Sequence, residues 1–246
     1  MRRFVYEHKK NDIILCMKKH LILIDDHPLM RIGIKNWFEK KSLWTVDYEA
    51  GSMEETAYII EEIKDDILQQ KSNSNCKEKM FSEVYVAIVD LSFKNEYGNS
   101  CTHGFEIIKK LKSALPEIKC IVFSYYENAG LIEKAISPQV GASGYVSKNA
   151  DEKTLLFAVE NVAAGKTFIQ PELVPNLLEI KNIYNAFTKK ERTVVDGIAK
   201  DLSNEEIAGA MDISIRTVEN YISRLYDKTD TNNKIELLER LGLRSM

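Results

Sequence analysis

Five chemically active side chains stand at the ends of short apolar runs in the first 150 residues. Asp25 and Asp26 follow "LILI", Asp90 follows "VAIV", Ser124 ends "IVFS" and Lys148 follows "GYVS". Crowded carboxylates raise one another's pKa unless a cation neutralises them. A hard ion such as Mg²⁺ is held by one or two carboxylates, a backbone carbonyl and waters. A hydroxyl and an ammonium group facing that centre would bind a phosphoryl group, provided that the fold brings these residues together.

The order of elements predicts how they meet. Apolar runs alternate with amphipathic stretches, which is the pattern of strands and helices. We predict an α/β doubly wound sheet of five parallel strands, the flavodoxin-like arrangement, whose ligands gather at the carboxyl ends of the strands. The expected strands are 20–26, 44–50, 84–92, 119–126 and 141–148. The expected helices are 28–41, 53–70, 103–115, 128–137 and 151–165.

The strand pattern ends near residue 165, and a second, all-α unit is predicted after it. Residues 166–187 contain two prolines and one short amphipathic piece, which indicates a linker with a helix rather than a core element. Two capping boxes, Thr188 with Glu191 and Ser203 with Glu206, mark helix starts. The expected helices of this unit are 188–200, 203–211, 214–228 and 233–241.

Residues 20–165 resemble the receiver domain of two-component response regulators. The resemblance implies that Asp90 accepts a phosphoryl group from a histidine kinase or a phosphotransfer protein. It also implies that Asp25 and Asp26 bind Mg²⁺ together with Asp90 and the backbone carbonyl of Ser92. The remaining residues implied to bind the phosphoryl group or act as the switch are Ser124, Tyr145 and Lys148.

The loop after the acceptor departs from the usual receiver pattern. Phe93 and Lys94 stand where Met-Pro is common, and "KNEYGNSCTH" is an insertion before Gly104. Its Tyr-Gly pair, with the preceding "DLS", resembles the corresponding loop of RcsB-type regulators. The insertion motivates one alternative, a degenerate receiver that acts as a phosphorylation-independent DNA-binding or partner-recruiting module. A haloacid-dehalogenase-like phosphatase would need a second aspartate at position 92, which is serine, so we expect no enzyme.

Residues 187–230 resemble the LuxR-type helix-turn-helix of the NarL/FixJ family, with "IRTVENYISRLYDKT" as the recognition helix. Val218, Ile222 and Leu225 recur at helical spacing and are expected to face the core. In a major groove, asparagine reads adenine and arginine reads guanine or clamps a phosphate. The expected DNA-contacting residues are Arg216, Thr217, Glu219, Asn220, Ser223, Arg224 and Lys228.

The charge of the helical unit bears on its partners. Residues 188–246 carry ten basic and eleven acidic side chains, a formal net charge of -1. A balance of this kind gives weak nonspecific attraction to phosphate backbones, so promoter binding would need two half-sites acting together. We therefore expect a homodimer, with a heterodimer with an auxiliary regulator as the alternative. "KTD" at 228–230 replaces the "KLG" common in the family.

The amino-terminal residues 1–19 precede the expected receiver. The segment "MRRFVYEHKK" has charges where a signal peptide needs its apolar centre, and no apolar run reaches the length of a membrane span. We expect a cytoplasmic protein without membrane contact. Residues 1–19 are interpreted either as a loose basic tail or as the result of a mispredicted start codon. The predicted units are thus 1–19, 20–165, 166–187 and 188–246.

Overall fold

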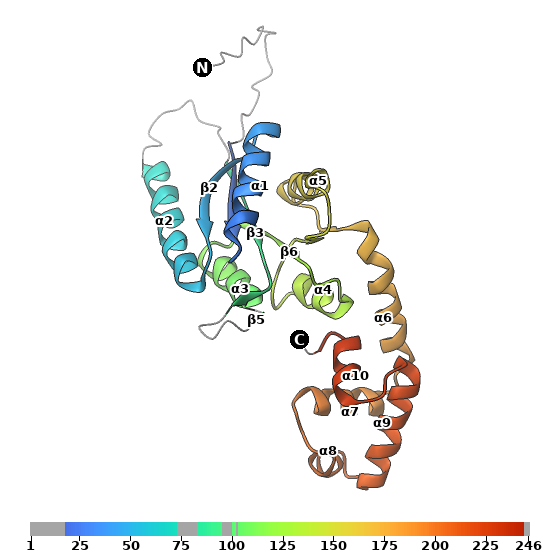
Figure 1. Ribbon diagram of the computed structural model, residues 1–246. Coiled ribbons are helices and arrows are strands. Elements are labelled where there is room, and N and C mark those ends of the chain that lie inside the picture. The colour runs from blue at the N-terminus through green and yellow to red at the C-terminus, as the bar shows by residue number, and fades with distance from the viewer. Residues whose placement is uncertain (1–17, 73–82, 95–99, 102, 244–246) are drawn as a thin grey trace, which may run out of the picture.

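The computed structural model describes residues 18–72, 83–94, 100–101 and 103–243. Its main sheet is parallel, in the order β2-β1-β3-β6-β7-β8 (Figure 1). The strands are β1 Lys18–Ile24, β2 Thr45–Ala50, β3 Glu83–Val89, β6 Lys119–Ser124, β7 Gly144–Ser147 and β8 Phe168–Ile169. A separate antiparallel pair comprises β4 Phe93–Lys94 and β5 Ser100–Cys101. The predicted α/β architecture is confirmed, with one more strand in the main sheet than expected.

Helices cover both faces of the sheet, as the buried apolar runs require. On one face, α1 and α5 pack through Phe38 and Leu155 against Leu23 and Ile121. On the other face, α2, α3 and α4 pack over Val89 and Val122 in a second apolar cluster. These helices are α1 Pro28–Lys41, α2 Met53–Ser72, α3 Gly104–Ala114, α4 Ala129–Ile136 and α5 Glu152–Ala163.

The segment predicted as a linker takes part in the packing of the receiver-like unit. Residues 168–169 form β8, which pairs in parallel with β7. A 3₁₀ turn, Pro171–Leu173, then leads into α6 Val174–Ala186. Leu173, Leu177 and Ile180 are buried in the same cluster as the α4 residues. The expectation that this segment lies outside the core is therefore wrong, because its apolar side chains cover α4.

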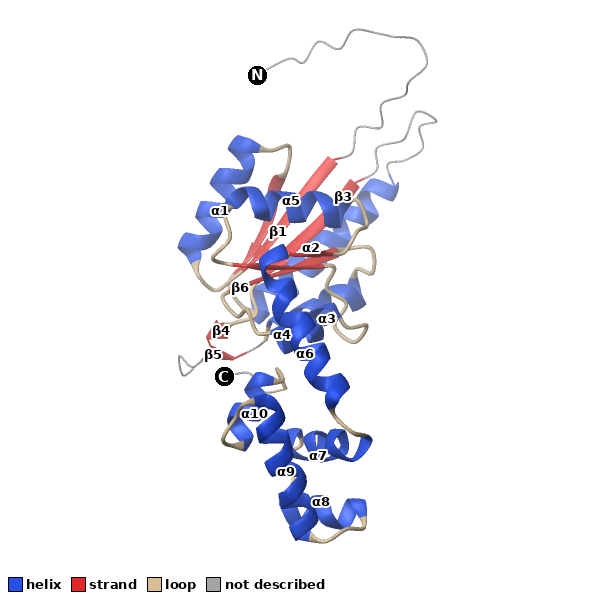
Figure 2. Ribbon diagram, turned by 90° about the vertical axis from the view of Figure 1, so that its right-hand side faces the viewer, coloured by secondary structure: helices blue, strands red, loops and turns tan. Residues whose placement is uncertain are grey.

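The carboxy-terminal unit is a small helical bundle (Figure 2). Its helices are α7 Lys189–Ala199, α8 Asn204–Met211, α9 Ile215–Thr229 and α10 Lys234–Arg240. Both predicted capping boxes are present, with Thr188 and Ser203 each accepting a hydrogen bond from the amide of the glutamate three residues later. The expected stripe on α9 is confirmed, since Val218, Ile222 and Leu225 are buried against Ile207 and its neighbours. Burial of each such side chain contributes about 1.5–3 kcal/mol to folding.

Candidate functional site: an acidic centre at the sheet edge and an exposed helix face

The sheet register brings the first two acidic positions together. β1 and β3 are neighbours, with Ile24 opposite Val89, so Asp25 and Asp90 leave the sheet side by side. The amide of Asp90 donates to the carbonyl of Ile24 at 2.8 Å. The amide of Asp25 donates to the carbonyl of Ala50, the last residue of β2, at 3.0 Å. This hydrogen bond fixes the end of β1 beside the end of β2. The two carboxylates are thus positioned by the sheet itself and not by a loop.

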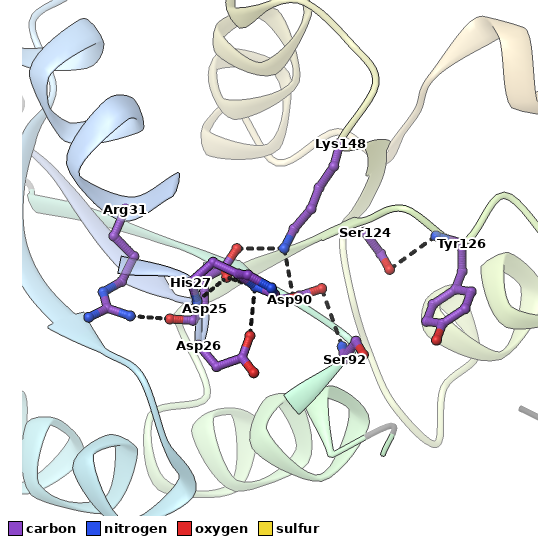
Figure 3. Close-up of polar contacts among 9 residues, drawn as sticks. All are labelled: Asp25, Asp26, His27, Arg31, Asp90, Ser92, Ser124, Tyr126 and Lys148. Atoms are coloured by element: carbon purple, nitrogen blue, oxygen red, sulfur yellow. Dashed lines mark hydrogen bonds and ion pairs between the residues drawn. The ribbon is translucent and has the colours of Figure 1, made fainter. Parts of the chain in front are cut away.

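Lys148 bridges these two carboxylates. Its Nζ lies 2.7 Å from Oδ2 of Asp25 and 2.7 Å from Oδ2 of Asp90 (Figure 3). The lysine follows β7 directly, and its amide donates to the carbonyl of Ser124 at 2.9 Å. All three charged side chains are almost completely buried. A buried charge persists only where a partner compensates it, so this bridge allows two carboxylates to stay in the interior.

Burial and pairing act on the ionisation of the centre in opposite directions. Burial raises the pKa of Asp90, and the ammonium of Lys148 offsets only part of that rise. Burial by itself would lower the pKa of Lys148, but the two neighbouring carboxylates outweigh it, so the pKa of the lysine is raised. The lysine therefore stays charged at neutral pH, and Asp90 lies in surroundings that favour a further cation or its own protonation.

Asp26 and His27 form the mouth of the centre. Nδ1 of His27 lies 2.7 Å from Oδ1 of Asp26 and 3.1 Å from Oδ1 of Asp25, and the histidine side chain is half exposed. Potential ligand atoms of Asp25, Asp26, His27 and Asp90 all lie within 4.8 Å of one another. The oxygen donors of this set fit a hard divalent cation. His27 was not predicted as a site residue, although it directly follows the acidic pair in "DDHP".

Ser92 and Ser124 lie at the same sheet edge as Asp90. The amide of Ser92 donates to Oδ1 of Asp90 at 3.2 Å, which holds the carboxylate toward the loop after β3. Ser124 is fully buried at the end of β6, and its hydroxyl accepts from the amide of Tyr126 at 3.3 Å. Figure 3 shows Ser124 at the same sheet edge as Asp90, with its hydroxyl directed toward Tyr126.

Tyr145 is fully buried in β7 and bonded to the same loop. Its hydroxyl donates to the carbonyl of Tyr126 at 2.6 Å. Burial raises the pKa of this phenol, so it remains a neutral donor at physiological pH. The structure thus places both predicted switch residues, Ser124 and Tyr145, in contact with one loop, residues 125–128, which leads into α4.

Gly104 explains how the centre tolerates the inserted loop. A Cβ on this first residue of α3 would collide with the carbonyl oxygen of Asp90. The amide of Gly104 donates to the carbonyl of Leu91 at 3.2 Å. α3 therefore begins in direct contact with the backbone of Asp90, despite the insertion before it. Residues 95–99 and 102 of that insertion lie outside the described residues.

The predicted DNA-contacting face of α9 is exposed, with one exception. Five of its residues are exposed to solvent: Arg216, Glu219, Asn220, Ser223 and Arg224. Arg216 pairs with Glu219 across one turn at 3.4 Å. Thr217 is partly buried, and its hydroxyl lies 2.8 Å from that of Ser214, the residue that caps the helix. This face could meet a nucleic acid without any rearrangement inside the bundle.

Lys228, by contrast, is engaged within the bundle. Its Nζ lies 2.9 and 2.8 Å from the two carboxylate oxygens of Glu191 and 2.9 Å from the carbonyl of Ala186. Glu191 is buried and also closes the capping box of α7. Burial would raise the pKa of Glu191, but Lys228 and the Thr188 amide together lower it. Sequence reasoning missed this role because the two partners are 37 positions apart.

Comparison with known proteins now bears on both units. Residues 185–241 match the family described as bacterial regulatory proteins, luxR family. Response regulator protein VraR of Staphylococcus aureus is 24% identical over 223 residues, covering 88% of this chain and 92% of VraR.

Solved structures share the fold along nearly the whole chain. A structure of the two-component response regulator RcsB in complex with DNA covers 93% of this chain and 100% of its own, with a TM-score of 0.61 and 21% identity. RcsB from Salmonella enterica serovar Typhimurium, bound to promoter rprA in the presence of the phosphomimetic BeF₃⁻, covers 92% and 98%, with a TM-score of 0.60 and 24% identity.

Fold, site and comparisons define a class of protein, a receiver-like α/β unit followed by a LuxR-type helix-turn-helix. Residues 185–241 match the luxR family, so the carboxy-terminal unit is a LuxR-type helix-turn-helix, and 88% of the chain is similar to the response regulator VraR. Structural neighbours of this chain include RcsB, as the loop resemblance predicted. Among the described helices, none has the combination of length and apolar character needed to span a bilayer.

Proposed function

We propose that Asp90 is phosphorylated by a histidine kinase or a phosphotransfer protein and that this controls dimerisation and promoter binding. The observation that carries the proposal is Lys148, whose Nζ stands 2.7 Å from Asp90 at a buried sheet edge. An ammonium group held there would pair with an incoming phosphoryl group without moving far. The protein would act where promoter DNA lies, in the cytoplasm.

Mg²⁺ is the ion that the donor set fits. Asp25, Asp26, Asp90 and the carbonyl of Ser92 would hold it, with waters completing its coordination. When bound, the ion would neutralise charge on the phosphoryl oxygens during transfer. The burial that raises the pKa of Asp90 also means that a nearby cation favours its ionised, nucleophilic form.

Phosphoryl transfer itself asks little covalent chemistry of the chain. An oxygen of the Asp90 carboxylate would attack the phosphorus of a phosphohistidine, forming a P–O bond as the P–N bond breaks. The released imidazole takes up a proton, and Asp90 becomes an acyl phosphate. Lys148 and the hydroxyl of Ser124 would hold the phosphoryl oxygens, since both belong to the edge that carries Asp90.

The same contacts suggest how the signal leaves the centre. Ser124 would turn from the Tyr126 amide toward the phosphoryl group, because charge-assisted hydrogen bonds are the stronger ones. The loop at 125–128 would then lose one of its anchors, and Tyr145 would adjust with it. Phosphorylation shifts a population between states, so unphosphorylated protein should bind DNA more weakly rather than not at all.

The DNA-binding part of the proposal rests on the exposed face of α9. Arg216, Asn220, Ser223 and Arg224, with Thr217 and Glu219 beside them, would meet base edges and phosphates. The proposed functional units are the receiver at 20–165, the linker at 166–187 and the DNA-binding domain at 188–246. RcsB structures described as dimers bound to DNA support a dimeric assembly. A homodimer is proposed, and a heterodimer with an auxiliary regulator is the alternative assembly.

The test is the intact mass and size of the full chain with Mg²⁺ and acetyl phosphate, compared with Asp90→Asn. We expect an adduct of about 80 Da, the mass of one phosphoryl group, on the wild type alone, with a shift toward dimers. Asp90→Asn keeps the shape of the side chain while removing the nucleophile. If neither acetyl phosphate nor a purified kinase gives an adduct, the phosphorylation-independent module becomes the better description.

A further inference from the structure

Arg31, near the start of α1, contacts the backbone of the acidic centre. Its Nη1 donates to the carbonyl oxygen of Asp25, and Figure 3 shows the guanidinium reaching this atom from the side of α1. The arginine side chain is mostly enclosed. It is not one of the four residues whose ligand atoms gather at the centre. Arg31 therefore touches the acidic pair from outside the set of atoms that could hold a cation.

The carbonyl of Asp25 needs such a donor because the pairing of β1 with β2 ends beside it. The two strands pair in parallel as far as Ala50, whose carbonyl still accepts from the amide of Asp25 at 3.0 Å. The amide of Gly51 turns away and donates to Oε2 of Glu55 at 2.6 Å. Asp25 is buried, and a buried carbonyl without a hydrogen bond is unfavourable. The guanidinium satisfies this carbonyl and fixes the peptide that joins Asp25 to Asp26.

Glu49 at the end of β2 draws the guanidinium toward the sheet. Its Oε2 lies 3.9 Å from Nε of Arg31, and its Oε1 lies 2.7 Å from Nζ of Lys35, one turn further along α1. The longer distance is that of an ion pair without a hydrogen bond, so Glu49 attracts the guanidinium without competing for the N–H group that serves Asp25. Lys35 thus shares a carboxylate with Arg31, whereas its ammonium is bonded to Glu49 rather than to Asp25.

Gly51 leaves space for the guanidinium at the end of β2. A Cβ on Gly51 would lie 2.9 Å from Nη1 of Arg31, the same nitrogen that donates to Asp25. Carbon atoms do not approach a neighbour so closely, and the flexible arginine would move to relieve the contact. Gly51 is not among the glycines with positive φ, so alanine adds no backbone strain there. The hydrogen bond to Asp25 can therefore be disturbed from either of two residues.

We infer that Arg31 is a positioning residue for the divalent cation, because it fixes the peptide between Asp25 and Asp26 and so directs both carboxylates toward Asp90. The peptide is planar, so its rotation would turn the Cα–Cβ bond of Asp26 away from the centre. The inference rests on the proposed function, since the cation concerned is the Mg²⁺ proposed for that site. Groups that hold metal ligands in place commonly account for ten- to a hundredfold in metal affinity, on the order of what we expect from Arg31.

The test is the stabilisation that Mg²⁺ gives to the full chain, measured by urea unfolding across a series of Mg²⁺ concentrations. A ligand that binds only the folded state stabilises it according to the ratio of its concentration to its dissociation constant, so the midpoints yield that constant for each variant. Arg31→Ala should bind Mg²⁺ about tenfold more weakly than the wild type. Gly51→Ala should show a smaller loss in the same direction, because the guanidinium is displaced and not removed.

A purely structural role for Arg31 predicts a different result. It would lower the urea midpoint without Mg²⁺ and leave the dissociation constant for Mg²⁺ unchanged. Isothermal titration calorimetry on the folded proteins measures the same constant directly. Gly51→Ala removes no polar group, so it tests the inference even if Arg31→Ala does not fold.

Two matched controls belong to this experiment. Lys35→Ala removes the other cation bonded to Glu49 without touching Asp25, so Mg²⁺ binding should not weaken. Gly33→Ala is the control for Gly51→Ala, since no atom lies within 4 Å of its missing Cβ. Equal dissociation constants for wild type, Arg31→Ala and Gly51→Ala would overturn the positioning role, as would an equal loss in Lys35→Ala. A wild type that gains no stability from Mg²⁺ would instead overturn the metal site of the proposed function.

Discussion

At the edge of the sheet, Asp25, Asp90 and Lys148 are buried and paired at 2.7 Å, whereas on α9 charged residues such as Arg216 and Arg224 stand in solvent. The first arrangement is fixed by strand ends, and its charges are strongly coupled because little water screens them. The second is open to a partner and weakly coupled within the protein. The chain thus encloses one set of charges at the sheet edge and leaves the other, on α9, accessible to a partner.

The largest effect is expected when the ammonium group that joins the two buried carboxylates is removed. Lys148→Ala leaves the carboxylates of Asp25 and Asp90 facing each other without a cation, and removing one partner of a buried charged group costs about 3–5 kcal/mol. Urea unfolding at pH 7.5 should show this loss. At pH 5 the loss should be smaller, because protonation of one carboxylate relieves the repulsion. Lys153→Ala, an exposed change on α5, is the control, and equal stability of the two variants would contradict the account.

The second prediction compares two basic residues of α9, Arg224 and Lys228. Arg224→Ala should weaken binding to a promoter duplex by about 1–3 kcal/mol or, for a phosphate contact, reduce the salt slope by about one. Lys228→Ala should leave that slope unchanged, because its ammonium already serves Glu191 and Ala186. It should instead lower the free energy of unfolding by about 1 kcal/mol. Fluorescence anisotropy with a labelled promoter duplex across a salt series measures this slope for each variant. An equal decrease of the salt slope in both variants would show that Lys228 also contacts DNA.

The smallest expected effect concerns the ionisation of Asp90 itself. Burial raises the pKa of Asp90 above its ordinary value of 3.8, so the folded state binds more protons than the unfolded chain. The stabilisation that this proton gives is fully present below that value and is lost as pH rises through the raised pKa. Asp90→Asn should therefore be more stable than wild type at pH 7.5, because the amide removes a buried charge. The urea midpoints of wild type and Asp90→Asn should converge as the pH is lowered. A variant less stable than wild type at neutral pH would contradict the raised pKa of Asp90.

The elements with strong periodicity, and the residues at their ends, could be predicted from the sequence. Asp25, Asp90 and Lys148 could be predicted to meet because parallel strands with alternating helices leave few topologies open. β8 was missed, since Phe168 and Ile169 are too few to show a period. The pairing of Lys228 was missed for another reason. Long-range partners leave no trace in local spacing, so residue type alone indicated a DNA contact.

The contact between Gly104 and the carbonyl of Asp90 has a consequence for how this loop can vary in length. Lengthening a flexible connection adds only about 0.6 kcal/mol for each doubling of its residues. The start of α3 lies against the backbone of Asp90, and the glycine at position 104 allows that approach by its lack of a side chain. The position of α3 is therefore set by this contact and not by the length of the chain between Phe93 and His103. In descendants of this sequence, we expect that stretch to vary while residue 104 stays glycine.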